Sequence, residues 1–161
     1  MEQPTPLFSL QDFQVEDSVG YLLKRTRAML TNAAEGTLAE QGLDITHSQG
    51  SLLFMLSTGK YRTAADLARE LCIDAASMKR MIDRLATRGL IRRQPNAQDR
   101  RLIDLHLTAT GLALAQQLPA VYVATLNKSF AGFSAEEVGF LKSLLRKLLA
   151  NADVVSPHKT T

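Results

Sequence analysis

Apolar residues along most of this chain recur with the spacing of amphipathic helices. From Asp17, apolar residues recur at intervals of three and four until Gly42, which predicts a long helix over residues 17–41. Shorter stretches of the same kind follow, and each begins with a residue whose side-chain oxygen can cap a helix. These capping residues are Thr46, Thr63 and Asp74. The chain is therefore predicted to begin with one long helix and three short ones.

The pattern changes between residues 90 and 108. Residues 90–94 and 102–107 are short apolar segments, and the second alternates like a half-buried strand. Pro95 and Asn96 lie between them and are typical of a turn. The segments predict a two-stranded hairpin with a long basic tip. Ile103, Leu105 and Leu107 are expected on the buried side of its second strand, with Asp104 and His106 on the exposed side.

Two further helical patterns follow the hairpin. Thr108 caps a pattern of about twenty residues, and Pro119 within it should kink or split the helix. Ser134 begins a capping box that leads into a strong apolar seam. At the other end, Pro4 and Pro6 oppose a regular helix and predict an arm that packs on another surface. The tail from residue 151 is expected to fray.

Composition narrows the class of partner. The chain has 161 residues, enough for one domain with a helical extension, and carries a formal net charge of +3. Residues 58–105 hold 11 basic and 6 acidic side chains, whereas residues 1–57 hold 3 and 7. A basic segment favours a polyanionic partner, although a solvated face with its counter-charges elsewhere would give the same counts. No membrane helix or signal peptide is recognised, so a cytoplasmic protein is expected.

The order of elements predicts a DNA-binding unit. Two short helices joined by a tight turn and followed by a basic hairpin form a winged helix-turn-helix. The second of these helices should bury its apolar side and turn the opposite side toward the major groove. Its predicted DNA-binding residues are Ala75, Ala76, Ser77, Lys79, Arg80 and Arg84. Thr63 is expected to contact a DNA phosphate. Arg100 and Arg101 at the hairpin tip are expected to enter a narrow minor groove.

At these residues the sequence resembles the MarR family of transcriptional regulators. Asp99-Arg100-Arg101 is similar to the family's Asp-x-Arg wing motif. It lies between GLIRR at residues 89–93 and LTATG at residues 107–111, which are similar to the segments that flank the family's wing. Residues 81–85 resemble the end of the family's recognition helix, and the resemblance covers roughly residues 17–150.

The resemblance implies a mainly α fold, in which a winged helix-turn-helix lobe with a two-stranded β-hairpin is flanked by N- and C-terminal dimerisation helices. The expected divisions are residues 1–45 for the arm and first dimerisation helix, 46–108 for the DNA-binding lobe, and 109–161 for the C-terminal helices and tail. A homodimer would bind a pseudo-palindromic operator in double-stranded DNA with half-sites about 10 bp apart. By the same resemblance, Asp99 would brace an arginine and Arg101 would enter the minor groove.

The resemblance also implies a repressor that is released by a small effector, such as an aromatic carboxylate or a phenol. The effector is expected between the dimerisation helices and the lobe. Its candidate contacts are Tyr21, Arg25, His47 and Met55. For His47, a solvated or capping residue is the alternative interpretation. For Arg25, the alternative is a simple surface charge.

Other functional classes have less support in the sequence. No phosphate loop, catalytic motif or metal-ligand motif is present, so no enzyme, metal or cofactor is expected. A winged helix that binds only protein is an alternative, but it would not need cationic residues on two separate elements. Cys72, in the predicted turn, is expected to be a small buried apolar residue. A redox-responsive regulator that uses this thiol is the remaining alternative.

Overall fold

The fold is described from a computed structural model that places residues 7–152. The expectations for Pro4, Pro6 and the tail beyond residue 152 lie outside the described residues. Contacts within the chain divide it into two units, residues 1–126 and residues 127–161, and each unit is described by itself.

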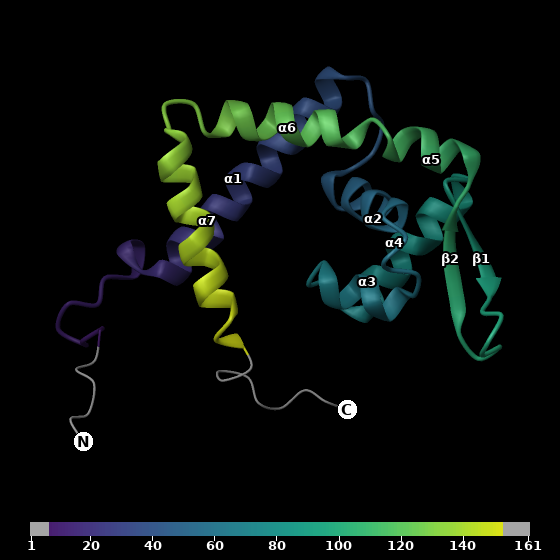
Figure 1. The fold of residues 1–161 in the computed structure, drawn as a ribbon, viewed down its shortest axis with the longest axis horizontal. Coiled ribbons are helices and arrows are strands. Elements are labelled where there is room, and N and C mark those ends of the chain that lie inside the picture. Colours follow the sequence, from purple (N-terminus) through teal and green to yellow (C-terminus); the bar gives the residue numbers. More distant parts are fainter. Residues whose placement is uncertain (1–6, 153–161) are drawn as a thin grey trace. The chain divides into compact units, whose positions relative to one another are not determined.

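Within the described residues the fold is helical apart from one two-stranded hairpin (Figure 1). This confirms the predicted mainly α fold with a β-hairpin wing. The elements in chain order are the 3-10 turn η1 (Val15–Asp17), α1 (Val19–Glu40), α2 (His47–Ser57), α3 (Ala64–Glu70), α4 (Ala75–Thr87), β1 (Ile91–Pro95), β2 (Ile103–Leu107), α5 (Ala109–Ala115), α6 (Leu118–Ser129) and α7 (Ala135–Leu149).

The predicted helix starts are confirmed by their capping geometry. Thr46 and Gln49 form a full capping box at α2, and Ser134 and Glu137 form another at α7. Each box satisfies backbone N–H groups that have no partner inside the helix. The N-cap residues of the other three predicted starts likewise accept a hydrogen bond from a backbone N–H three residues on. These are Thr63 at α3, Asp74 at α4 and Thr108 at α5.

The helix-turn-helix is held together by a shared apolar core. Leu67 of α3 and Met78 and Leu85 of α4 are almost fully buried. They belong to one cluster with leucines of α2 and with the start of the hairpin. Because a helix has 3.6 residues per turn, burial of this side of α4 leaves its opposite side in solvent.

The hairpin matches the predicted strands but not their predicted faces. β1 and β2 pair antiparallel, with Ile91 opposite Leu107 and Pro95 opposite Ile103. Leu105 is buried as expected, but Asp104 is only 7% exposed whereas Ile103 is 44% exposed. The expected alternation is therefore wrong at these two positions. The reason is that β2 also meets the segment before α3, where the backbone N–H of Leu105 donates to the carbonyl of Arg62 at 2.7 Å.

Pro119 splits the predicted twenty-residue helix. α5 ends at Ala115, and α6 begins at Leu118, so the proline is the second residue of α6. A proline in the first turn loses no intrahelical hydrogen bond, because that N–H would have no partner. The chain therefore forms two helices with a turn between them, where the spacing of apolar residues alone predicts one helix.

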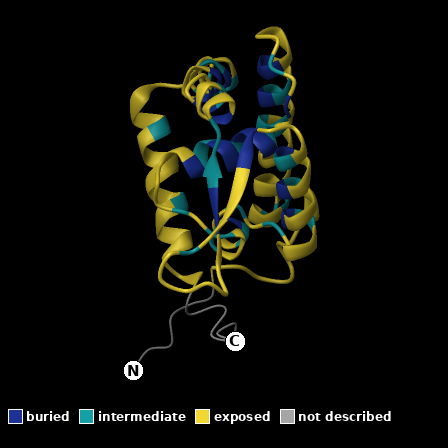
Figure 2. Ribbon diagram, turned by 90° about the vertical axis from the view of Figure 1, so that its right-hand side faces the viewer, coloured by how far each residue is buried: buried dark blue, intermediate teal, exposed yellow. Residues whose placement is uncertain are grey.

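Apolar side chains remain exposed on the long helices. In Figure 2 much of the helical ribbon is yellow, the colour of exposed residues. On α1, Leu22, Leu23 and Met29 are each 40% exposed or more. On α7, the apolar seam is likewise uncovered, and Phe140 and Leu149 are among its exposed members. Each helix thus carries an apolar face that nothing in its own unit buries.

The junction between the hairpin and α5 requires a glycine at position 111. A Cβ atom on Gly111 would lie 1.9 Å from the carbonyl oxygen of Leu90, so the backbone would have to move. We expect Gly111→Ala to lower the unfolding free energy by about 1–3 kcal/mol, the usual cost of overpacking. Urea denaturation would measure it. Gly139→Ala is the control, because a Cβ there meets nothing within 4 Å and alanine favours the helix. Equal stabilities of wild type and Gly111→Ala would contradict this account of the junction.

Candidate nucleic-acid interface

The outward side of α4 presents the residues predicted to contact DNA. Ala75, Ala76, Lys79, Arg80 and Arg84 are exposed, and Ser77 is partly exposed. The start of the helix is well ordered by its cap, since the carboxylate of Asp74 accepts the backbone N–H of Ser77 at 2.8 Å. Hydrogen bonds from Ser77, the backbone one first, hold the pKa of Asp74 below its usual value. Arg80 donates to the hydroxyl of Ser77 at 2.7 Å, which draws the guanidinium toward the N-terminal end of α4.

The hairpin tip presents the second cationic group. Asp99, Arg100 and Arg101 are all exposed. The carboxylate of Asp99 accepts the backbone N–H of Arg101 at 2.9 Å. Asp99 therefore holds the backbone of Arg101, and the brace that the resemblance implies stays a prediction.

An ion pair that the sequence did not reveal joins the hairpin to α4. Arg93 of β1 pairs with Asp83 on the outward edge of α4. The two residues are ten positions apart on different elements, so no local pattern signals their contact. The pair neutralises two charges at the edge of the outward face, and it leaves Lys79, Arg80 and Arg84 as the other cations of that face.

A recess of about 550 Å³ shows that α3, α4 and the hairpin border one surface. Its lining comes from the start of α3, from the outward side of α4 and from both strands of the hairpin. Among the lining residues are Ala64, Lys79, Asp83, Arg93 and Ile103. The structure thus brings together the elements that the sequence analysis assigned separately to one interface.

Thr63 caps α3, and its expected contact with a DNA phosphate stays a prediction. Its hydroxyl accepts the backbone N–H of Asp66 at 3.2 Å and donates to the Asp66 carboxylate at 2.8 Å. The hydroxyl proton is therefore already used within the cap.

Cys72 is exposed, so the expectation of a buried residue was wrong. The physical reason is the end of α3, where the chain adopts a left-handed conformation at Cys72 with a φ of 52°. The N–H of Ile73 returns to the carbonyl of Ala68 at 2.9 Å, as in a common helix-terminating motif. In that motif the following residue makes the apolar contact, and here Ile73 is the residue packed against the core.

The four candidate effector contacts do not gather at one place. Tyr21 and Arg25 pair with each other near the start of α1, where the guanidinium donates to the phenol oxygen at 3.2 Å. His47 instead meets Glu35, whose carboxylate accepts the His47 backbone N–H at 2.7 Å. Fourteen residues of helix separate Tyr21 from Glu35, which is about 21 Å along the axis. Met55 is partly buried and packs against the core.

His47 lies in a partly buried polar cluster. Its ring stands edge-on to Tyr122 with 5.9 Å between centroids, and its Nδ1 atom is buried without a hydrogen-bond partner. Burial lowers the pKa of His47, the Glu35 carboxylate opposes that shift, and the Arg27 guanidinium adds to it. His47 is therefore partly buried, and the N-cap of α2 is Thr46.

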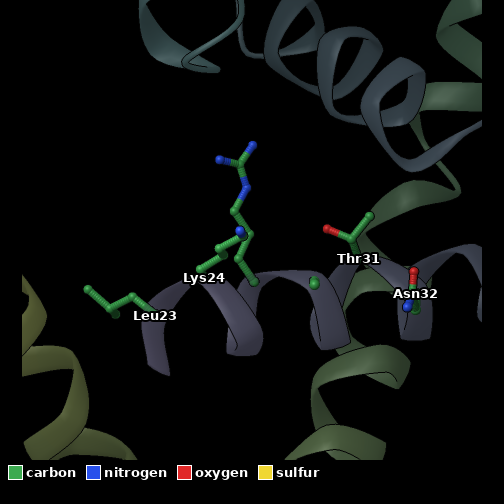
Figure 3. Close-up of a pocket in the computed structure, with 6 residues that line it drawn as sticks. Leu23, Lys24, Thr31 and Asn32 are labelled. Carbon is green, nitrogen blue, oxygen red and sulfur yellow. The ribbon is translucent and has the colours of Figure 1, made fainter. Parts of the chain in front are cut away.

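A recess of about 570 Å³ beside α1 has the chemistry of an anion site, although sequence analysis did not select its residues. Lys24 and Thr31 project from the same side of the α1 ribbon (Figure 3). Arg27 lines the recess between them along the helix. The helical spacing of three and four residues places these polar groups in a row.

Among the described residues, no group of three or more His, Cys, Asp or Glu side chains could hold a metal ion. In the same part of the chain, no helix is long and apolar enough to cross a membrane.

The helices, turn and wing together define a winged helix-turn-helix protein. Comparison with known proteins then identifies its family. The MarR family model matches residues 45–103. The chain is 32% identical over 108 residues to the multiple antibiotic resistance protein MarR of Escherichia coli, covering 66% of this chain and 75% of that protein. It is 31% identical over 130 residues to an HTH-type transcriptional repressor of Mycobacterium tuberculosis, covering 81% and 92%. The chain belongs to the MarR family.

Solved structures agree with this assignment. The reduced form of MarR from Escherichia coli has a TM-score of 0.71 and 28% sequence identity, covering 82% of this chain and 96% of that chain. A cysteine-to-serine mutant of the same protein, solved in complex with operator DNA, has a TM-score of 0.74 and 28% identity, covering 81% and 93%.

The lowered pKa of His47 predicts a pH dependence of stability. Because the folded-state pKa lies below the unfolded value near 6.5, the unfolded chain binds the proton more readily. Stability is therefore complete above about pH 6.5 and falls as the pH drops below it. We expect the unfolding free energy in urea to fall more between pH 7.5 and 5.5 for wild type than for His47→Gln. Equal losses in the two proteins would contradict the assigned burial of His47.

Proposed function

We propose that this protein is a transcriptional regulator that binds double-stranded DNA and is not an enzyme. α4 enters the major groove, and the hairpin tip with Arg100 and Arg101 reaches the adjacent minor groove. The observation that carries the proposal is the shared surface around the 550 Å³ recess, because Lys79 of α4 and Arg93 of the hairpin both line it. The Escherichia coli relative was solved with operator DNA, and the Mycobacterium tuberculosis relative is a repressor.

The exposed apolar faces of α1 and α7 support a homodimer. Exposed apolar surface of this extent on soluble helices usually marks an interface. In this proposal, residues 1–45 and 109–161 form the dimer and residues 46–108 bind DNA. Two lobes related by a twofold axis would occupy a pseudo-palindromic operator with half-sites about 10 bp apart.

The test of DNA binding is selection of duplexes from a randomised library by the full-length protein, followed by a salt titration with the selected duplex. The logarithm of the association constant should fall linearly with the logarithm of the salt concentration, because phosphate contacts release counterions. A protein that selects no duplex, and instead binds a protein partner without salt dependence, would favour the alternative of a protein-interaction module.

Arg80 and Arg101 should contribute to binding in different ways. If Arg80 binds guanine, Arg80→Ala should lose about 1–3 kcal/mol at one base position and little elsewhere. Arg101→Ala should weaken binding across sequences, since a minor-groove arginine responds to groove shape and potential. Fluorescence anisotropy with the selected duplex and its single-base variants would measure both effects. Arg146→Ala on α7 is the control for loss of one positive charge. A uniform loss from Arg80→Ala would mean that Arg80 binds phosphate.

We further propose that the protein is a repressor released by a small anionic aromatic molecule. Lys24, Arg27 and Thr31 give the recess beside α1 two cations and a hydroxyl, which suit a carboxylate or phenolate. A ligand of this kind can release DNA only if it binds the DNA-free arrangement of the lobes more tightly. The alternative is a redox-responsive regulator that uses Cys72. Its thiol is exposed, two residues before the N-cap of α4.

A screen of aromatic carboxylates and phenols by thermal shift should find ligands that raise the melting temperature and lower operator affinity. We expect Arg27→Gln to abolish the response and Arg25→Gln, which removes a charge from the same helix, to retain it. The opposite result would place the effector beside Tyr21. If no compound acts, but an oxidant releases DNA from wild type and not from Cys72→Ser, the thiol is the sensor.

A further inference from the structure

Asp104 is a buried carboxylate with an unusual place in the wing. It lies in β2 and is only 7% exposed. Its backbone forms an isolated antiparallel bridge with Thr63, just before α3. A buried carboxylate is costly unless it accepts hydrogen bonds. The amide nitrogen of Asn96 donates to both oxygens of Asp104, at 3.1 Å to Oδ1 and 3.0 Å to Oδ2. Among the described residues, these side-chain hydrogen bonds to Asp104 come from Asn96.

Asn96 in turn holds the hairpin tip. It follows β1 directly, and its amide oxygen accepts the backbone N–H of Gln98 at 2.9 Å and that of Asp99 at 3.0 Å. Asp99 then accepts the backbone N–H of Arg101 at 2.9 Å. A continuous chain of hydrogen bonds therefore runs from the buried Asp104 to the exposed arginines at the tip.

The acceptor oxygens of Asp104 set the orientation of Asn96. An ionised carboxylate only accepts hydrogen bonds, so the amide of Asn96 must turn its nitrogen toward Asp104. Its oxygen is then left facing the N–H groups of Gln98 and Asp99. An apolar side chain at position 104 would impose no such orientation.

We propose that Asp104 is a positioning residue that fixes the conformation in which Arg100 and Arg101 meet DNA. The inference rests on the proposed DNA-binding function. It adds how the exposed tip is ordered before DNA binds. Without this order, the tip would lose conformational entropy at the moment of binding.

The first experiment needs no DNA. Amide hydrogen exchange is measured by NMR on the full-length protein as wild type, Asp104→Leu, Asp104→Asn and His106→Leu. Asp104→Leu should speed exchange at Gln98 and Asp99 by about tenfold, the effect of losing one hydrogen bond, with the amides of α4 unchanged. Asp104→Asn keeps an acceptor for Asn96 and should stay close to wild type. His106→Leu changes a polar residue of the same strand and should leave the tip unaffected.

The second experiment is a double-mutant cycle on affinity for the selected duplex. Asp104→Leu should weaken binding about tenfold in the wild-type background and far less in Arg100→Ala/Arg101→Ala, because the groups it positions are then absent. Asp104→Asn should restore most of the affinity. A merely structural role would lower stability and give losses that add.

Unchanged exchange at Gln98 and Asp99 in Asp104→Leu would overturn the proposal, and so would additive losses of affinity. If the wild-type protein binds no duplex, the proposed function fails. In that case the exchange measurement still decides whether Asp104 orders the tip.

Discussion

Burial of one side of α4 is the constraint on which the interface depends. Met78, Ile82 and Leu85 lie in the core, and the helical period then sends Lys79, Arg80 and Arg84 to the opposite side. The small residues at the start of α4 lie on the same outward surface, where a duplex can approach the backbone closely. The packing that stabilises the lobe thus also selects which side chains are available to a polyanion.

The wing has its own attachments to this core, so its tip has a defined place relative to α4. At its base, the hydroxyl of Thr108 donates to the carbonyl of Gly89 at 2.6 Å, and Gly111 allows α5 to lie against Leu90. Along its length, Arg93 pairs with Asp83 of α4. Toward its tip, Asp104 and Asn96 hold the turn. The strands of the wing are thereby held against α4.

Local signals predicted most of the fold. What they missed depends on how one helix ends and on contacts between distant residues. The capping residues Thr46, Asp74 and Ser134 act within one helical turn, so the sequence is sufficient to place them. The exposure of Cys72 depends on how α3 ends, and the burial of Asp104 depends on the segment before α3. For the site, the outward face of α4 and the basic tip were predictable. The pairing of Arg93 with Asp83 was not, because no short-range pattern encodes it. The polar residues of α1 do share helical spacing, but the sequence does not show that a recess lies beside them.

The central claim is that α4 and the wing tip contact one duplex together, in two copies related by symmetry. Chemical footprinting of the selected duplex with full-length protein tests it most directly. The account predicts protection in the major groove at two half-sites about 10 bp apart, with minor-groove protection beside each. Protection of a single half-site, or of the major groove without the minor groove, would contradict it.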